Sequence, residues 1–230
     1  MELADYRKSD DPFTIDLEAE AQAIRRVILG TDKPSESALQ RVRQFLIDVE
    51  KWKADCMEER TGNAVKNRAE QIWESLRGAI TASSDLHALL SIMDLVGFGS
   101  SRDENTGQRR AKRATAVLRF LDPDQWGTVD WRTIAMLSFY KNNHFDMKLA
   151  LKEAKKHDIA TIASCFDVVD EKIALEIVQE YRGMRDQRSR RTVDVELALY
   201  CASFSAWPRP KSHQRRETFT FSRYEERGLR

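Results

Sequence analysis

The chain has 230 residues, of which 41% are hydrophobic and 33% are charged, and it contains only 9 Gly and 5 Pro. This composition supports one large domain or two small ones, and it excludes collagen-like, low-complexity and wholly disordered chains. No apolar run approaches the ~18 residues of a membrane-spanning helix. The acidic N-terminus also lacks the apolar segment of a secretory signal. We therefore expect a cytoplasmic protein with no membrane partner.

The net charge of +1 hides an uneven distribution along the chain. Residues 1–60 hold 10 Lys/Arg and 14 Asp/Glu, whereas residues 181–230 hold 12 Lys/Arg and 6 Asp/Glu. A further basic cluster lies mid-chain, at Arg109, Arg110, Lys112 and Arg113. Such a distribution indicates either a face for a polyanion or merely a solvated helix surface with a basic tail.

The sequence lacks the residue patterns of several classes of functional site. The three cysteines, Cys56, Cys165 and Cys201, are far apart and show neither a disulfide framework nor CxxC spacing. The phosphate-loop, serine-hydrolase and metalloprotease motifs are absent as well. We therefore expect no metal, no cofactor and no disulfide.

Apolar residues at three- and four-residue steps predict an all-α protein. The steps from Leu39 to Trp52 predict a long helix after Pro34 that ends near residues 60–62. A second helix is expected around residues 72–80, and Ser84 is expected to cap a third that ends at Met93. The glycines after it end the helical pattern, and residues 100–108 are expected to form a loop.

The second half of the chain continues with helices. In the helix that Pro123 ends, Ala114 and Leu118 mark the buried face, and Arg109, Lys112 and Arg119 fall roughly on the opposite side. The remaining helices are predicted at residues 131–141, 145–156, 159–165, 170–183 and 192–204. We expect an N-terminal helical lobe (1–80), a core (81–207) and a basic C-terminal extension (208–230).

The glycines at 97 and 99 are the first functional signal. Glycine permits positive φ angles and a close approach of the backbone. A turn of this kind before a helix points backbone N–H groups at an anion such as a phosphate. Taken alone, Gly97-Phe98-Gly99 is more typical of an ordinary turn.

The sequence around this turn resembles the helix–hairpin–helix DNA glycosylases, closest to a divergent branch akin to 8-oxoguanine DNA glycosylases found in bacterial and phage-defence settings. The matching residues are Gly97, Gly99, Ala114, Ala116, Leu118, Phe120, Leu121, Pro123, Trp126, Gly127, Val129, Asp130 and Arg132. A second match begins at Arg191 and includes Asp194. The resemblance covers about residues 85–205 and implies an all-α helical bundle with two lobes around a cleft.

The resemblance implies a DNA glycosylase that flips out a modified or damaged base and cleaves its N-glycosidic bond, leaving an abasic site. Asp130 lies where the family places its catalytic aspartate. A carboxylate there stabilises positive charge on the deoxyribose or activates the nucleophile. Asp130 is also well suited to cap the following helix, and the two roles are compatible.

Lys112 is the second catalytic candidate. Bifunctional members of the family carry a nucleophilic lysine two residues before the alanine that Ala114 matches. Counting back from Asp130 instead arrives at Ala111, and about ten additional residues separate Gly99 from Lys112. Nearby arginines would lower the pKa of this lysine, but they also fit a phosphate-contacting stripe. We therefore expect a monofunctional glycosylase rather than a lyase, with Lys112 as an open alternative.

The remaining candidates contact DNA or the base. The expected DNA contacts are Gly97, Phe98, Gly99, Arg109, Arg113, Arg132 and Arg191. The expected base-pocket residues are Trp131, Tyr140, Asn143, His144 and Asp194, for which core packing, loop hydrogen bonding or, for Asp194, helix capping are the alternatives.

The expected partner is double-stranded DNA, bound by a monomer. The phage-defence branch favours a hypermodified phage base, such as glucosylated hydroxymethylcytosine, ahead of oxidised guanine. Two other functions stay open: a non-catalytic helix–hairpin–helix protein that binds DNA as a scaffold, and an enzyme of the same fold that acts on a base attached to RNA or protein.

Overall fold

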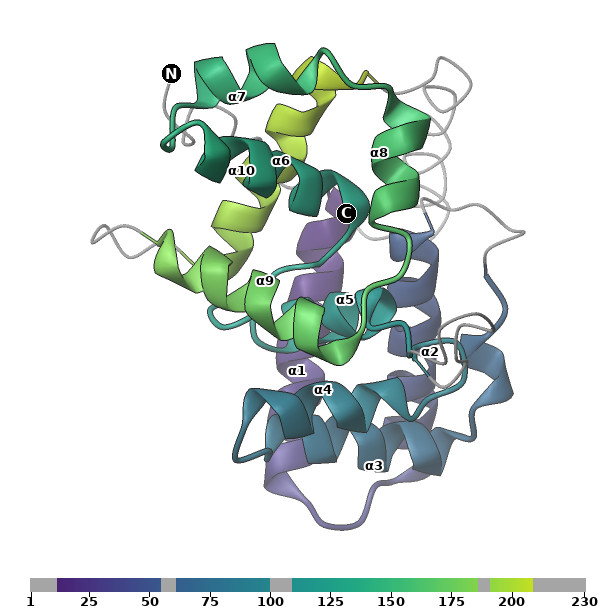
Figure 1. Cartoon of the computed structure of the whole chain (residues 1–230). Helices are drawn as coiled ribbons and strands as arrows, with labels where there is room; N and C mark the ends of the chain where they lie inside the picture. Colours follow the sequence, from purple (N-terminus) through teal and green to yellow (C-terminus); the bar gives the residue numbers. More distant parts are fainter. Residues whose placement is uncertain (1–11, 55–60, 100–108, 186–190, 209–230) are drawn as a thin grey trace.

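The computed structural model describes residues 12–54, 61–99, 109–185 and 191–208. These residues form ten α-helices and one short 3-10 helix, and they contain no strand, so the all-α prediction is confirmed. We divide the helices along the chain into two groups, α1–α5 and α6–α10. Figure 1 shows α3 and α4 at the bottom of the view, α6, α7 and α8 in its upper part, and α9 across the middle at the height of α5. None of the described helices has the length and hydropathy needed to cross a membrane.

The first group begins with a helix that the sequence analysis did not predict. Its helices are α1 (Pro12–Gly30), α2 (Glu36–Lys53), η3 (Ala64–Lys66), α3 (Ala69–Ile80), α4 (Asp85–Met93) and α5 (Lys112–Leu121). The side chains of Ser35 and Ser84 accept backbone N–H bonds and cap α2 and α4, as expected for serine at these positions. α2 is shorter than predicted, because it ends at Lys53 rather than near residues 60–62.

The second group follows the predicted helices closely. It consists of α6 (Trp131–Asn142), α7 (Met147–Ala154), α8 (Ile159–Cys165), α9 (Glu171–Gly183) and α10 (Thr192–Ala206). An aspartate side chain caps each of the first four by accepting backbone N–H bonds, at Asp130, Asp146, Asp158 and Asp170. These caps fix where the helices begin.

Helix α5 is surrounded by other helices, which corrects one prediction. Its residues from Ala114 to Leu121 are all buried, and α1, α2 and α4 pack against it. Arg119, expected on an exposed face, is only 1% exposed and lies 3.5 Å from the Glu196 carboxylate of α10. Its guanidinium also lies over the Trp52 and Phe120 rings. The helical period marks the most apolar face, but it does not show that other elements cover the remaining faces.

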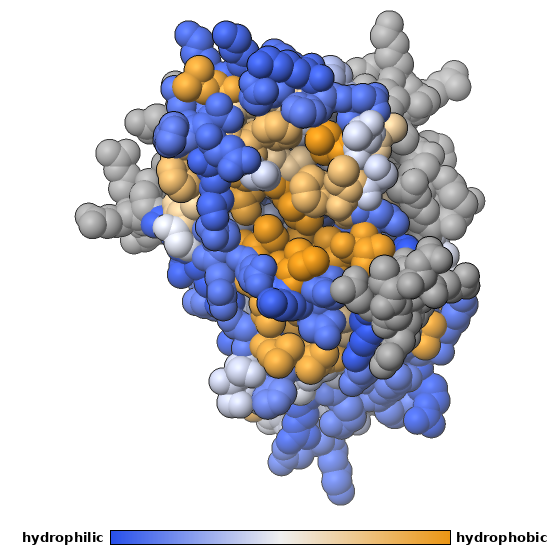
Figure 2. All heavy atoms as spheres, in the orientation of Figure 1, coloured by the Kyte–Doolittle hydropathy of each residue, from blue (hydrophilic) through white to orange (hydrophobic). Residues whose placement is uncertain are grey.

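The predicted boundary at residue 80 lies between two helices that pack against each other. α3 contacts α4, and α5 contacts α1 and α2, so residues 85–93 and 112–121 pack with the N-terminal helices. The predicted C-terminal extension lies outside the described residues, except for Pro208. Figure 2 shows hydrophobic side chains in the middle of one face, between the two groups of helices, with polar side chains around them.

Candidate active site

The Asp130 side chain lies at the start of α6, and both of its oxygens have partners. Oδ1 accepts the backbone N–H of Thr133 at 3.0 Å, and the Thr133 hydroxyl accepts the Asp130 N–H at 3.1 Å. Oδ2 lies 3.3 Å from the Nζ of Lys53. The aspartate is therefore a helix cap, as one reading of the sequence predicted. Its side chain retains 18% exposure and faces a cation rather than packed hydrocarbon.

The surroundings of Asp130 keep its carboxylate ionised. Burial raises the pKa of this carboxyl, but the Lys53 ammonium and the hydrogen bond from the Thr133 N–H outweigh burial and hold the pKa below its ordinary value. The group thus carries a negative charge at neutral pH. A fixed negative charge in a shielded site is what stabilises a developing cation most effectively.

Lys53 is a site residue that the sequence analysis missed. It is the last residue of α2, in the other group of helices from Asp130, and its side chain is 15% exposed. Lysine is seldom buried to this extent without a partner, and here the partner is the Asp130 carboxylate. The only signal in the sequence was a lysine at the end of an amphipathic helix, which does not identify a contact with α6.

Lys112 is the first residue of α5 and lies in the same electrostatic environment. Its side chain is 19% exposed, and its Nζ is 4.0 Å from Oδ1 of Asp167. Burial lowers the pKa of Lys112 to about 8; Lys53 and Arg110 also lower it, while the carboxylates of Asp167 and Asp130 oppose them. The start of a helix is also an unfavourable place for a positive charge.

This pKa makes the amine of Lys112 chemically competent. At a pKa of about 8, roughly a tenth of the amine is unprotonated at pH 7, compared with well under a thousandth at the ordinary lysine value. The unprotonated form is the nucleophile. Of the two registers that the sequence allowed, the one at Lys112 offers an amine within the electrostatic influence of Asp130. Ala111 is fully buried and donates its N–H to the Val169 carbonyl.

The glycine hairpin is held in a rigid, close-packed turn. Gly97 has a φ of 83°, and a Cβ there would lie 2.2 Å from the Cβ of Asn63. Gly99 has a φ of 147°, and a Cβ there would lie 2.7 Å from the Cβ of Met93. The Asn67 side chain accepts the Val96 N–H at 2.8 Å. Both glycines are therefore required by conformation and by space.

Two arginines join this hairpin to the start of α5, although about ten residues separate them in sequence. Arg109 donates from Nε to the Gly99 carbonyl at 3.1 Å and pairs with Asp94 at 2.9 Å. Arg113 donates to the Gly97 carbonyl at 3.3 Å and to Glu50 at 3.1 Å. The hairpin and Lys112 are thus neighbours in space. Residues 100–108, the rest of the insertion, lie outside the described residues.

Several of the proposed DNA contacts are engaged within the fold. Phe98 is 1% exposed, so its side chain belongs to the core. Arg132 is 8% exposed and donates to the Trp207 carbonyl at 2.8 Å. Arg191 pairs with Glu18 of α1. These side chains fix helices to one another, so contacts of this region with DNA would come from the hairpin backbone and other cations.

The proposed base-pocket residues are not brought together at Asp130. Tyr140, Asn143 and His144 lie at the other end of α6, roughly 15–20 Å away at the rise of an α-helix. Asp194 accepts the Arg191 N–H at 3.0 Å, the capping role that was its alternative. Only Trp131, the first residue of α6, is adjacent to Asp130, and it packs against Arg132 and Trp207.

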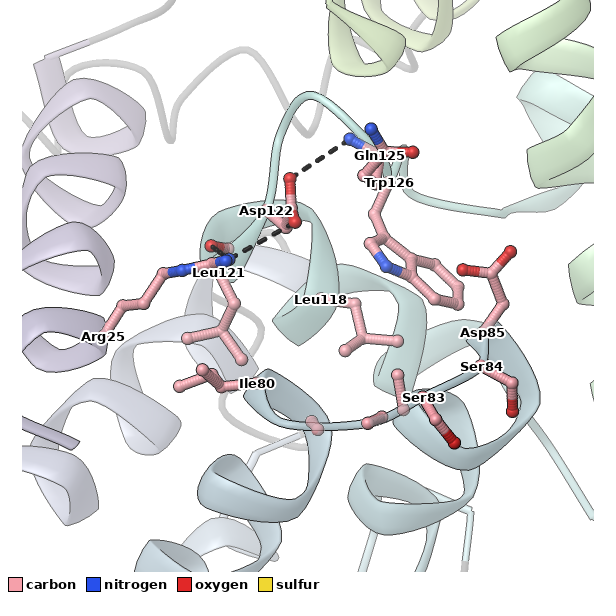
Figure 3. Close-up of a pocket in the computed structure, with 13 residues that line it drawn as sticks. Arg25, Ile80, Ser83, Ser84, Asp85, Leu118, Leu121, Asp122, Gln125 and Trp126 are labelled. Carbon is pink, nitrogen blue, oxygen red and sulfur yellow. Dashed lines mark hydrogen bonds and ion pairs between the residues drawn. The ribbon is translucent and has the colours of Figure 1, made fainter. Parts of the chain in front are cut away.

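A separate pocket of about 190 Å³ lies away from this site (Figure 3). It is formed by α1, the turn between α3 and α4, and the C-terminal end of α5, and Trp126 closes one side. Arg25 pairs with Asp122 at its edge. Lys112 is at the opposite end of α5, about 15 Å distant at the helical rise. This pocket is therefore not part of the arrangement around Asp130.

Comparison of the chain with protein-family models, with curated proteins and with solved structures finds no match. Within the described residues, no group of three or more His, Cys, Asp or Glu side chains is arranged to hold a metal ion. The chemistry of the site must therefore be inferred from Asp130, Lys53 and Lys112.

Proposed function

We propose that the protein is a DNA N-glycosylase that removes a modified or damaged base, with Asp130 as its essential carboxylate and Lys112 as its nucleophile. The observation that carries the proposal is a shielded Asp130 carboxylate held 3.3 Å from Lys53, with Lys112, whose pKa is about 8, within its electrostatic influence. A carboxylate and a partly neutral amine are the two groups that glycosidic cleavage by a lysine needs. Their position beside a glycine hairpin supports the resemblance seen in the sequence.

Asp130 would act on the deoxyribose of an everted nucleotide. As the bond between C1′ and the base nitrogen breaks, positive charge develops on the sugar. The Asp130 carboxylate stabilises this charge electrostatically, because it is ionised and held in a fixed orientation by Thr133 and Lys53. Its partial burial strengthens the interaction by limiting access of water.

Lys112 would form the covalent bond. The lone pair of its neutral Nζ attacks C1′, the base leaves with the electrons of the glycosidic bond, and the proton that Nζ loses goes to the base nitrogen. Opening of the sugar ring then gives an imine between Nζ and C1′, and addition of water releases an aldehydic abasic site and regenerates the amine. The low pKa of Lys112 favours this route over the monofunctional one that the sequence alone led us to expect.

The first test is the substitution Asp130→Asn. Asparagine caps helices nearly as well as aspartate, so the fold is retained while the negative charge is lost. We expect base release to fall by at least about a hundredfold, the usual effect of removing one electrostatic stabiliser. Asp146→Asn is the matched control, because Asp146 caps α7 in the same way and lies away from the site. Equal activity of the Asp130 and Asp146 variants would exclude the proposal.

The substrate base is identified by mass spectrometry of the bases liberated from several phage genomes, with unmodified DNA, RNA and free nucleosides as comparisons. Release of a hypermodified base from phage DNA supports a defence role, and release of oxidised guanine supports repair. Salt-sensitive DNA binding with no abasic product on any of these substrates would favour the non-catalytic DNA-binding protein instead.

A further inference from the structure

One lysine side chain pairs with the Asp130 carboxylate at 3.3 Å, and a second, from another helix, lies within the electrostatic influence of both groups. Lys53 comes from the C-terminal end of α2 and Lys112 from the N-terminal end of α5, and both interact with Asp130 of α6. The chemistry proposed above uses one amine and one carboxylate. Beyond holding Asp130, Lys53 is a largely shielded positive charge whose effect on Lys112 that scheme does not use.

We infer that Lys53 is a positioning residue that orients the Asp130 carboxylate and, through its own positive charge, keeps the neighbouring Lys112 amine nucleophilic. The inference rests on the proposed function, because it assigns Lys112 as the nucleophile. Lys53 itself forms no bond to the substrate.

The backbone next to Lys53 is firmly held, as a positioning role requires. Its neighbour Trp52 donates an indole N–H to the Thr14 hydroxyl at 2.9 Å. The Trp52 ring meets Phe120 of α5 edge-on at 5.0 Å between centroids. α2 is therefore fixed to the helix that carries Lys112. A lysine on a backbone anchored this way places its ammonium reproducibly beside the Asp130 carboxylate.

The charges that face Lys112 come from four segments. Lys53 of α2 and Arg110, just before α5, disfavour its protonated form, whereas Asp167 in the α8–α9 turn and Asp130 at the start of α6 favour it. Lys53 lowers the pKa of Lys112 in two ways. It contributes a like charge directly, and it neutralises part of the Asp130 charge that would otherwise hold a proton on Lys112. Both effects have the same sign, so removing Lys53 makes Lys112 easier to protonate.

The experiment traps the imine on a probe that needs no knowledge of the base. A DNA duplex with a single aldehydic abasic site is mixed with protein and sodium cyanoborohydride. The amine of Lys112 and the C1′ aldehyde condense to an imine with loss of water, and hydride addition to the C=N bond gives a stable secondary amine. The rate of this cross-link is measured from pH 6 to pH 10 for wild type, Lys53→Met, Lys53→Arg and Lys141→Met.

We expect the wild-type rate to rise with a midpoint near pH 8, where Lys112 titrates. Lys53→Met keeps the side-chain bulk and should move the midpoint up by about one pH unit, so that trapping at pH 7 falls roughly tenfold. Lys53→Arg restores the charge and should restore most of the rate. Lys141 forms an ion pair with Glu180 between α6 and α9, so Lys141→Met controls for loss of a structural ion pair.

An unchanged midpoint in Lys53→Met would overturn the inference, even if its melting temperature falls, since a purely structural ion pair changes stability without changing titration. If wild type releases bases but does not trap, the nucleophile of the proposed function is wrong. In that case the pH dependence of Lys112 modification by an amine-reactive reagent, read by mass spectrometry in both proteins, tests the charge effect without DNA. The same pH dependence of Lys112 modification in wild type and Lys53→Met would also overturn the inference.

Discussion

At the scale of single residues, Lys112 is the clearest case of a site residue that lowers the stability of the folded protein. A lysine that is buried at the start of a helix and next to another lysine destabilises the fold in its protonated form. Such strained ionisation is characteristic of functional sites, although structural ion networks also produce it.

We therefore expect Lys112→Met to stabilise the protein at neutral pH. The unfolded chain holds the lysine proton up to its ordinary pKa of 10.5, whereas the folded chain releases it near pH 8. The penalty is fully present below pH 8 and disappears as the pH rises to 10.5, because the unfolded state binds more protons over this interval. The gain at pH 7 should reach about 3 kcal/mol at most.

Denaturant unfolding of wild type and Lys112→Met at pH 7, 9 and 10.5 measures this gain. Lys152→Met, on the exposed surface of α7, is the control and should change stability by less than about 0.5 kcal/mol. Loss of stability in Lys112→Met at pH 7 would show that the ammonium is stabilised by its carboxylate neighbours instead.

Sequence reasoning reached part of this site and missed the rest for a physical reason. Asp130 was identifiable because a cap residue and its helix are adjacent in sequence. Lys53 was not, because its partner lies on a helix from the other half of the chain. Contacts of this type depend on how helices pack, and the helical period of α2 contains no information about α6.

At the scale of elements, the hairpin offers a direct test of close packing. Gly62 and Gly97 both have positive φ angles, of 92° and 83°, but only Gly97 has a side chain, Asn63, in the space of a Cβ. We expect Gly62→Ala to destabilise by about 1 kcal/mol from backbone strain alone. Gly97→Ala should cost at least about 2–3 kcal/mol, since the backbone or Asn63 must also move.

The difference between these two variants, measured by thermal melting, isolates the steric contribution at the hairpin. Equal destabilisation would mean that the hairpin moves away from Asn63 freely. That result would also weaken the view that its backbone is preorganised to bind a phosphate.

Arg113 allows a structural role to be separated from a DNA contact. It pairs with Glu50, which is 2% exposed and also accepts backbone N–H bonds from Gly62, Asn63 and Ala64. Removing the guanidinium leaves this buried carboxylate with fewer partners. We expect Arg113→Met to lower the free energy of unfolding by about 2–4 kcal/mol in urea titrations. A change below about 0.5 kcal/mol would show that Arg113 has little structural role, and a phosphate contact would again be its expected function.

Several helix boundaries could be predicted from the sequence, for reasons visible in particular residues. Ser84, Asp130 and Pro123 mark helix ends by local hydrogen bonding and sterics, and the structure places the ends there. α1 was missed although Leu17, Ala21, Ile24 and Ile28 follow the helical period and are buried. Arg119 was placed on the wrong face because α10 supplies Glu196, a partner that no local pattern predicts.

At the scale of the whole molecule, binding of duplex DNA would depend on the cations that the fold does not use internally. Affinity should fall linearly with salt on logarithmic axes, with a slope of about −0.9 for each phosphate contacted. We expect the slope to be the same for wild type and Asp130→Asn, because the role proposed for Asp130 is in the chemical step rather than in phosphate binding. Fluorescence anisotropy of a labelled duplex between 50 and 300 mM salt, roughly the range over which such contacts weaken, measures both slopes.

A slope close to zero for the wild type would exclude duplex DNA as the partner. A slope that differs between the two proteins would place Asp130 near a phosphate instead of near the sugar ring.

The enclosure of Lys112 also has a consequence for selectivity. An amine that is unprotonated part of the time at neutral pH condenses readily with any small carbonyl compound, including open-chain sugars, and such adducts would block it. With four-fifths of its side chain shielded, Lys112 is less accessible to molecules in solution than an exposed lysine. Such adducts should therefore form more slowly at Lys112 than at a fully exposed amine of the same pKa.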